Sequence, residues 1–289
     1  MTVDTTCHAI LIRDLNSGLH RLDAFYQQIT QAPSAVRYSL DLKQINFLQS
    51  YDLLALTAGV RYLYQQCHLP VRLTNLNERT LLYLERMDFF LTCKEWIELA
   101  VDLPENKWDR NPDSGNLLEL TPITSTADIM AITARTARIC QPLQLPNLPQ
   151  ILQTLSELSS NAWEHSGERE GYALIQRYFN QQFREKVVCV AIGDMGRGIR
   201  GSLVERHGEF GEQPADYLLA ALSGKSSRMT GRGGLGLQTI ETTVAQEGGY
   251  LWIKSDLAAI YSRGPKQRRI SQPLTPFPGT QVVVELRSA

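Results

Sequence analysis

The sequence predicts an α/β protein built from two domains and a short linker. With 289 residues the chain is long enough for two ordinary domains, and 43% of its residues are hydrophobic, which suffices to bury a core. Strand-like and helix-like segments alternate through the first hundred residues, and this rhythm indicates a sheet covered by helices. Residues 103–116 then collect prolines, a glycine and several Asp and Asn residues, which is loop composition. We therefore expect domains at residues 1–103 and 117–289, joined by a linker at 104–116.

The spacing of apolar residues predicts the elements of the N-terminal domain in order. Repeats of three and four residues indicate helices, and alternation indicates half-buried strands. The expected strands are 9–12, 38–42 and 71–76, and the expected helices are 19–29, 51–67 and 78–90. Each strand is followed by a helix.

The C-terminal domain is predicted to begin with a strand at 117–120 and a helix at 126–139, with Thr124, Ser125 or Thr126 as its N-cap. Pro149 suits the first turn of a longer helix that ends near His165. Further strands are expected at 186–192, 249–254 and 281–287. The stretch between the last two contains KQRR, residues 266–269, which we expect to be a solvated loop.

Composition excludes several classes of function. The formal net charge of -1 gives no basic field for nucleic acid, and no apolar run approaches the roughly 20 residues of a membrane helix. The N-terminus lacks the pattern of a secretory signal. The five cysteines are far apart without a C-x-x-C pair, so we expect neither disulfides nor a zinc site, and a cytoplasmic location.

The segment SELSSNAWEHSG, residues 156–167, places a carboxylate and an amide on one helix face. Glu157 and Asn161 are four positions apart, which is about one helical turn. Two such oxygen donors suit a hydrated Mg²⁺ ion that also takes phosphate oxygens, and the carboxylate can orient or deprotonate a nucleophile. Taken alone, the segment fits an exposed polar helix face equally well.

A predicted buried strand leads into Asp194 within VAIGDMGRGI, residues 190–199. Gly196 and Gly198 allow backbone with positive φ and the close approach of a flat ligand. A carboxylate at a strand end can accept a hydrogen bond from an exocyclic amine such as N6 of adenine. An ordinary turn would show the same local pattern.

The segment TGRGGLGLQTI, residues 230–240, is the richest in glycine, with Gly231, Gly233, Gly234 and Gly236. Glycine-rich backbone N–H groups can form an anion-binding nest, and Lys225, Arg228 and Arg232 can reach phosphates as charged donors. Solvation at a loop surface is the alternative role for these three cations. The glycines also spell G-x-G-x-x-G, but loop residues precede them instead of the strand that a dinucleotide fingerprint requires, so we exclude that fingerprint.

Together these segments resemble the ATP-binding domain shared by gyrase-type topoisomerases, heat-shock chaperones, histidine kinases and mismatch-repair ATPases, the GHKL family. SELSSNAWEH is similar to its N box, GDMGRG and GRGGLGL to its two glycine boxes, and PGTQVVVEL, residues 278–286, to its closing strand signature. The resemblance covers roughly residues 117–289 and implies the GHKL (Bergerat) α/β-sandwich fold with ATP and Mg²⁺ as ligands.

The same resemblance implies a role for each motif residue. Asn161 would hold Mg²⁺, and Glu157 would be the base or water-orienting residue, in reach of Mg²⁺ through water. Asp194 would accept from the adenine amine with help from Thr280. Gly231 through Gly236 would form a hinged lid and the start of a helix that faces the phosphates.

Within the family, the N box is similar to the S-E-x-x-x-N-A-x-x-H form of anti-sigma-factor serine kinases. The alternative of a histidine kinase needs a phosphoacceptor histidine on a dimerising helix. None of His8, His20, His68, His165 and His207 lies in a persuasive acceptor motif. Related ATPase domains often dimerise, so a homodimer is expected by analogy.

The N-terminal domain resembles the STAS fold of anti-anti-sigma factors over about residues 8–100. The matching segment is YSLDLKQINFLQSYDLLALTAGV, residues 38–60, in which the positions that fit are Leu40, Asp41, Leu42, Phe47, Ser50 and Leu53. Gln49 replaces the acidic residue, Tyr51 the phosphorylatable serine and Asp52 the glycine of that pattern. We therefore expect a STAS-like binding or regulatory module instead of a phospho-switch.

The expected function is that of an ATP-binding regulator, an ATPase or protein serine kinase of the partner-switching kind. Its unidentified protein partner would be a STAS or sigma-factor-like regulator. Two alternatives stay open: a nucleotide-gated binding scaffold without meaningful catalysis, and an atypical histidine kinase.

Overall fold

The computed structural model describes residues 7–13, 15, 18–101, 103, 114–166, 170–182, 184–225 and 235–288. The chain divides into two compact units, Met1–Arg110 and Asn111–Ala289. Because residues 104–113 lie outside the described residues, the limits of the predicted linker stay a prediction.

The N-terminal unit is a four-stranded sheet in the order β1-β2-β3-β4, and every neighbouring pair is parallel. Its strands are β1 (Cys7–Leu11), β2 (Arg37–Asp41), β3 (Val71–Thr74) and β4 (Ile97–Leu99). Its α-helices are α1 (Leu22–Thr30), α2 (Ser50–Cys67), α3 (Glu78–Arg86) and α4 (Phe89–Thr92). Parallel strands need crossover connections, and the alternation of strand and helix predicted from sequence supplies them.

Two features of this unit differ from the prediction. The helix expected over 78–90 is divided into α3 and α4, because Asp88 adopts a left-handed conformation with φ of 59° between them. The short strand β4 was not predicted, since its three residues are too few to show a period.

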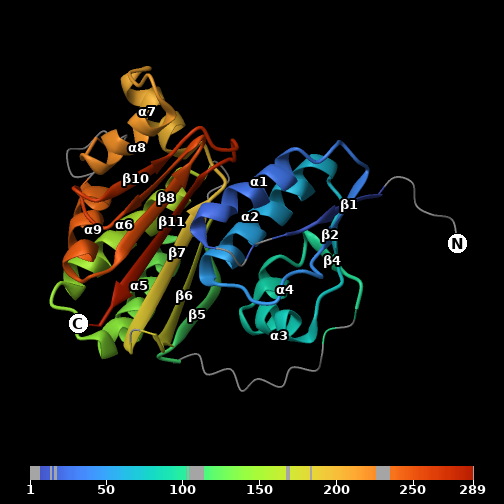
Figure 1. Ribbon diagram of the computed structural model, residues 1–289, viewed down its shortest axis with the longest axis horizontal. Coiled ribbons are helices and arrows are strands. Elements are labelled where there is room, and N and C mark those ends of the chain that lie inside the picture. The colour runs from blue at the N-terminus through green and yellow to red at the C-terminus, as the bar shows by residue number, and fades with distance from the viewer. Residues whose placement is uncertain are drawn as a thin grey trace, which may run out of the picture. The chain divides into compact units, whose positions relative to one another are not determined.

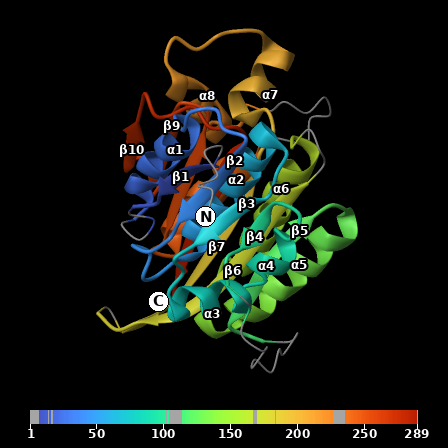
Figure 2. The same cartoon turned by 90° about the vertical axis from the view of Figure 1, so that its right-hand side faces the viewer.

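The C-terminal unit contains a seven-stranded antiparallel sheet in the order β10-β9-β8-β11-β7-β6-β5. Its strands are β5 (Leu117–Ile123), β6 (Gly171–Asn180), β7 (Glu185–Asp194), β8 (Tyr250–Ser255), β9 (Ala258–Ser262), β10 (Arg268–Ser271) and β11 (Thr280–Arg287). The helices α5 (Thr126–Cys140), α6 (Leu148–Glu164) and α9 (Leu235–Gln246) pack along one face of this sheet (Figure 1). Figure 2 shows α5 and α6 on that face from the side.

The helix layer follows from apolar stripes in the sequence. On α6 the buried residues Ile151, Leu155, Leu158 and Ala162 belong to the core that this helix shares with the sheet. Their spacing of three and four residues fixes which side of α6 faces the sheet. The polar positions of the same helix are then free to border a ligand site.

Two further α-helices of this unit, α7 (Gly198–His207) and α8 (Pro214–Leu222), lie together at one end of the sheet (Figure 1). Neither was predicted. In α7 the sequence GIRGSLVERH has two glycines and no clear apolar stripe, so it carries little helical signal.

The prediction for the KQRR run was wrong in part. Arg268 and Arg269 belong to β10, which pairs with β9 in antiparallel fashion. Arg268 donates from Nε and Nη2 to the two carboxylate oxygens of Glu241 on α9, each at 2.5 Å, and the Glu241 side chain has no exposure. A buried carboxylate requires a cation with matching geometry, which explains why only a fifth of the Arg268 side chain is exposed.

None of the helices among the described residues is long and apolar enough to cross a membrane. The five cysteines are all free thiols, and Cys93, Cys140 and Cys189 are buried. These three buried cysteines act as small apolar side chains in the cores of the two units.

Candidate functional site

One pocket of the C-terminal unit gathers the predicted motifs, although they lie far apart in the sequence. Its polar lining includes Glu157, Asn161, Asp194 and Thr280. Gly198, Gly236 and Lys225 lie on the same lining. The empty volume is about 840 Å³, space open to solvent at the mouth included.

Several predicted residues cannot be placed. Arg228, Gly231, Arg232, Gly233 and Gly234 lie outside the described residues. The predicted lid and phosphate nest therefore stay predictions. The described chain resumes at α9, whose second residue is Gly236.

Asp194 is a buried carboxyl group on the pocket lining. It ends β7 and is 6% exposed. Its Oδ1 accepts a hydrogen bond from the Gly196 N–H at 2.7 Å, and the Thr280 N–H also donates to this carboxyl. Burial raises the pKa of Asp194 from 3.8 to about 7, because desolvation disfavours the charged form and the two backbone donors offset it only in part. Such a group is suited to accept a hydrogen bond from a neutral amine.

Glycines bring backbone segments against Asp194 more closely than any other residue would allow. A Cβ atom on Gly196 would lie 1.9 Å from the carbonyl oxygen of His165, and one on Gly279 would lie 2.0 Å from that of Asp194. Gly198 and Gly279 also have φ of 69° and 82°, which side chains disfavour. These contacts form a tight backbone cradle around Asp194, and of the three glycines Gly198 lies on the pocket lining.

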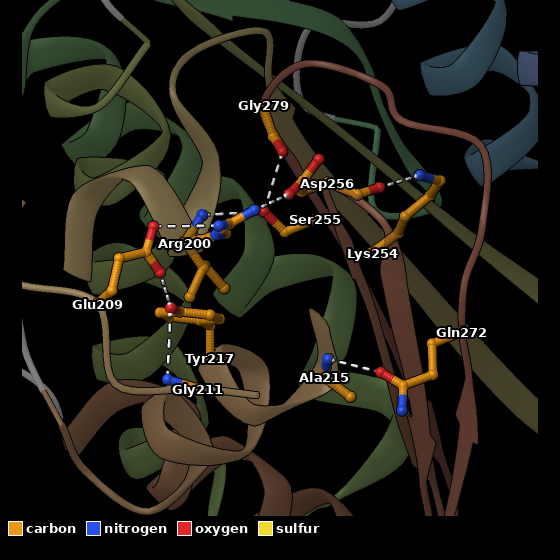
Figure 3. Close-up of polar contacts among 11 residues, drawn as sticks. Arg200, Glu209, Gly211, Ala215, Tyr217, Lys254, Ser255, Asp256, Gln272 and Gly279 are labelled. Atoms are coloured by element: carbon orange, nitrogen blue, oxygen red, sulfur yellow. Dashed lines mark hydrogen bonds and ion pairs between the residues drawn. The ribbon is translucent and has the colours of Figure 1, made fainter. Parts of the chain in front are cut away.

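Ser255, the last residue of β8, joins the two segments of this cradle. Its Oγ accepts from the Ile199 N–H at 2.9 Å and donates to the Gly279 carbonyl at 3.1 Å, and Thr280 Oγ1 lies 3.3 Å away. Figure 3 shows the contact with Gly279. The sequence analysis missed this serine, because it lies 56 positions from Ile199 and no local pattern marks it.

Glu157 and Asn161 project from α6 onto the pocket lining, one turn apart, as their spacing predicted. A Cβ atom on Gly236 would lie 2.5 Å from Glu157 Oε2, so this carboxylate packs against the backbone of the first turn of α9. The partial positive charge at the N-terminus of a helix favours a carboxylate in that place.

The apolar walls of the pocket were not predicted as site residues. They include Ile199, Leu203, Ala221, Leu237 and Ile253. Most belong to α7, α8 and α9, which close one side of the pocket. Apolar residues of this kind look like ordinary core positions in the sequence, so the only available signal was their proximity to the glycine motifs.

The oxygen donors suit a magnesium ion that is shared with phosphates. Among the residues that the structure describes, no three or more His, Cys, Asp or Glu side chains gather in a way that could hold a metal ion by themselves. Asn161 and Glu157 offer one amide oxygen and one carboxylate. A Mg²⁺ ion at this point would complete its shell with water and phosphate oxygens, as it commonly does beside nucleotides.

Comparison with known proteins agrees with this geometry. No curated protein matches the chain significantly. Residues 147–289 match the family described as histidine kinase-, DNA gyrase B-, and HSP90-like ATPase. The match begins at the N-cap of α6 and includes every motif of the pocket, whereas no comparison identifies the N-terminal unit. Residues 147–289 are therefore a GHKL-type ATP-binding domain.

Proposed function

We propose that the chain is an ATP-dependent regulatory protein, an ATPase or protein serine kinase of the partner-switching kind. The observation that carries the proposal is the convergence of Glu157, Asn161 and Asp194 on one pocket. One buried acceptor, two oxygen donors on a helix and a glycine cradle are the parts that a nucleotide with a bound Mg²⁺ ion requires.

Each residue has a role in this proposal. Asp194 accepts from the adenine amine, and Thr280 supports it from the start of β11, since its N–H already donates to that carboxyl. Gly196 and Gly198 keep the backbone beside the ring free of side chains. Lys225 approaches the phosphates from the end of α8.

Magnesium, when bound with ATP, would supply charge neutralisation at the phosphates. Asn161 would hold the ion through its amide oxygen, and Glu157 would reach it through water. Glu157 is also the base or water-orienting residue in this proposal, because it is the carboxylate on the α6 side of the pocket. A base must lie within hydrogen-bond reach of the hydroxyl or water that it activates.

The N-terminal unit would serve as the STAS-like binding module. Its parallel βα architecture is compatible with that role. A STAS or sigma-factor-like protein is the proposed partner, and the nucleotide state of the C-terminal unit would set the affinity for it.

The test is incubation of the full chain with Mg²⁺ and γ-labelled ATP, alone and with purified STAS and sigma-factor proteins. We expect either label on a serine or a complex that forms only with ATP. The Asp194→Asn variant is the control and should lose both. If wild type binds ATP but shows no transfer, no hydrolysis and no ATP-dependent complex, the proposed regulatory activity is wrong.

A second function, a nucleotide-gated scaffold without catalysis, is favoured by one contact. Glu157 packs against the backbone at Gly236, so its carboxylate can stabilise the start of α9 without activating a nucleophile. A ligand shifts such a conformation only by its differential affinity for the two states. Glu157→Gln separates the functions, because it keeps a side chain of the same shape against Gly236 but cannot act as a base. Loss of partner regulation with intact ATP binding indicates chemistry, and retention of both indicates a scaffold.

A further inference from the structure

The loop between α7 and α8 brings an aromatic ring to the pocket's lysine. The Nζ atom of Lys225 lies 3.6 Å from the centroid of the Phe210 ring. An ammonium group over the face of an aromatic ring is attracted by the ring quadrupole. The Phe210 side chain is 39% exposed, so the contact lies at the surface, where it competes with water.

Lys225 has a particular place in the pocket. Among the described lining residues it is the only lysine or arginine. Its side chain is long and flexible, and ordering such a side chain costs conformational entropy. A contact that orders it before a ligand arrives lowers that cost at the moment of binding.

The segment that carries Phe210 is itself held firmly. The Phe210 ring packs on the Tyr217 ring of α8, with centroids 4.7 Å apart. Tyr217 is buried, its hydroxyl donates to Glu209, and the Gly211 N–H donates to the same hydroxyl at 3.4 Å (Figure 3). The residues on both sides of Phe210 are thus bound to one side chain of α8.

A second set of contacts fixes this loop to the body of the unit. Arg200 of α7 donates to Glu209 at 3.0 Å and lies over the Tyr217 ring, 5.4 Å from its centroid. The same guanidinium lies 3.8 Å from the carboxylate of Asp256, in the turn that joins β8 to β9 (Figure 3). A Cβ atom on Gly211 would lie 2.9 Å from the Tyr217 ring, so only glycine allows this packing.

We propose that Phe210 is a positioning residue that presents the Lys225 ammonium to the polyphosphate of the bound nucleotide. The inference rests on the proposed function, because it takes the pocket to be a nucleotide site. Contact with one ring face leaves the ammonium with N–H donors for phosphate oxygens. Phe210 therefore contributes to the binding of phosphates and contributes nothing to the binding of the nucleoside.

The experiment compares ATP with adenosine by calorimetry on the full chain in Mg²⁺ buffer. The variants are Phe210→Leu, which keeps an apolar side chain without a ring, and Phe210→Tyr, which keeps the ring. Surface contacts of this kind predict that Phe210→Leu weakens ATP binding about two- to fivefold. Adenosine affinity should be unchanged, and Phe210→Tyr should bind ATP like wild type.

A double-mutant cycle ties the effect to the lysine. Lys225→Gln should weaken ATP binding and leave adenosine unaffected, and in that background Phe210→Leu should have no further effect. Three results for Phe210→Leu would overturn the proposal. ATP affinity could be unchanged, or ATP and adenosine could lose affinity equally. ATP could also bind more tightly, which would mean that the ring holds the lysine away from the phosphates. Failure of the nucleotide site itself is distinct, because wild type would then bind neither ligand, and failure of the regulatory activity alone would leave these binding results unchanged.

Discussion

Replacing Asp194 by Asn should stabilise the folded C-terminal unit while it weakens nucleotide binding. The folded carboxyl keeps its proton up to about pH 7, whereas the unfolded one loses it near 3.8. Between these values the folded state binds more protons, so stability falls as pH rises. Since tenfold in an acidity constant is about 1.4 kcal/mol, this difference in pKa makes the fold less stable than a group that never ionises would, by about 4 kcal/mol at pH 8 and by about 2 kcal/mol at pH 5.5.

Asparagine has nearly the same shape and never ionises. Its oxygen can accept from the Gly196 and Thr280 N–H groups that now donate to the carboxyl. The free energy of unfolding of Asp194→Asn should therefore exceed that of wild type by an amount that grows by about 2 kcal/mol from pH 5.5 to pH 8. Urea unfolding of both full-length proteins at several pH values measures it, and the unchanged N-terminal unit cancels in the comparison. A difference that stays constant over this range would refute the reasoning.

Binding should change in the opposite direction. The amide N–H₂ of Asn turns a donor toward the adenine amine, and a hydrogen bond to a charged acceptor contributes about 1.5–3 kcal/mol. We expect Asp194→Asn to bind adenosine about tenfold to a hundredfold more weakly at pH 8. Wild-type affinity for adenosine should also fall as the pH drops below about 7, because the carboxyl then becomes neutral. Affinity that is independent of pH and of the substitution would contradict this placement of adenine.

Three further predictions, two of them with a comparison variant, test the structural supports of the C-terminal unit and its site. Gly279→Ala should destabilise the unit by more than about 3 kcal/mol, because it combines φ of 82° with a Cβ atom 2.0 Å from a backbone oxygen at the end of β7. Gly208→Ala, with φ of 69°, ψ of -180° and nothing within 4 Å, carries only the backbone cost of about 1–3 kcal/mol, and thermal unfolding compares the two. Arg268→Met should lower the free energy of unfolding by about 3–5 kcal/mol, because the buried Glu241 carboxylate loses its cationic partner. Adding Glu241→Leu removes that carboxylate and should restore most of the lost free energy in urea unfolding. Ser255→Ala should weaken adenosine binding about tenfold by leaving a backbone N–H and a carbonyl of the cradle without their shared partner, and calorimetry that finds no change would exclude that role.

The site could be read from the sequence where function depends on local geometry. Glu157 and Asn161 share a face because four residues nearly complete a helical turn, and the structure places both on the pocket lining. Asp194 is the last residue of the buried strand β7, so its position at the end of a strand was also a local property of the sequence. The order of these motifs along the chain then identified the ATP-binding domain that residues 147–289 form.

The supports of the site could not be read in this way. Ser255 acts through groups 56 and 24 positions away, and only the folded sheet brings them together. The strand β10 has basic residues at an edge, where charged side chains are common and an alternating pattern is lost. Its Arg268 becomes structural only because α9 presents a buried Glu241 to it.

A capping box begins helix α2 of the N-terminal unit. Gln49 and Asp52, two of the departures from the STAS pattern, form a reciprocal capping box at the start of α2, in which Asp52 accepts from the Gln49 N–H at 2.9 Å. Asp52 is fully buried, and burial raises its pKa to about 7. Ser50 is 1% exposed and Tyr51 5%, so neither hydroxyl is open to a kinase in this conformation.

A phosphate at Ser50 would also be unfavourable on electrostatic grounds. It would add up to two negative charges beside the Asp52 carboxyl, in a place without water to screen them. The side chains that depart from the pattern thus use the start of α2 to build and bury a helix cap. The burial of Ser50 and the neighbouring Asp52 carboxyl support the proposal that the N-terminal unit binds a partner instead of acting as a phosphorylation switch.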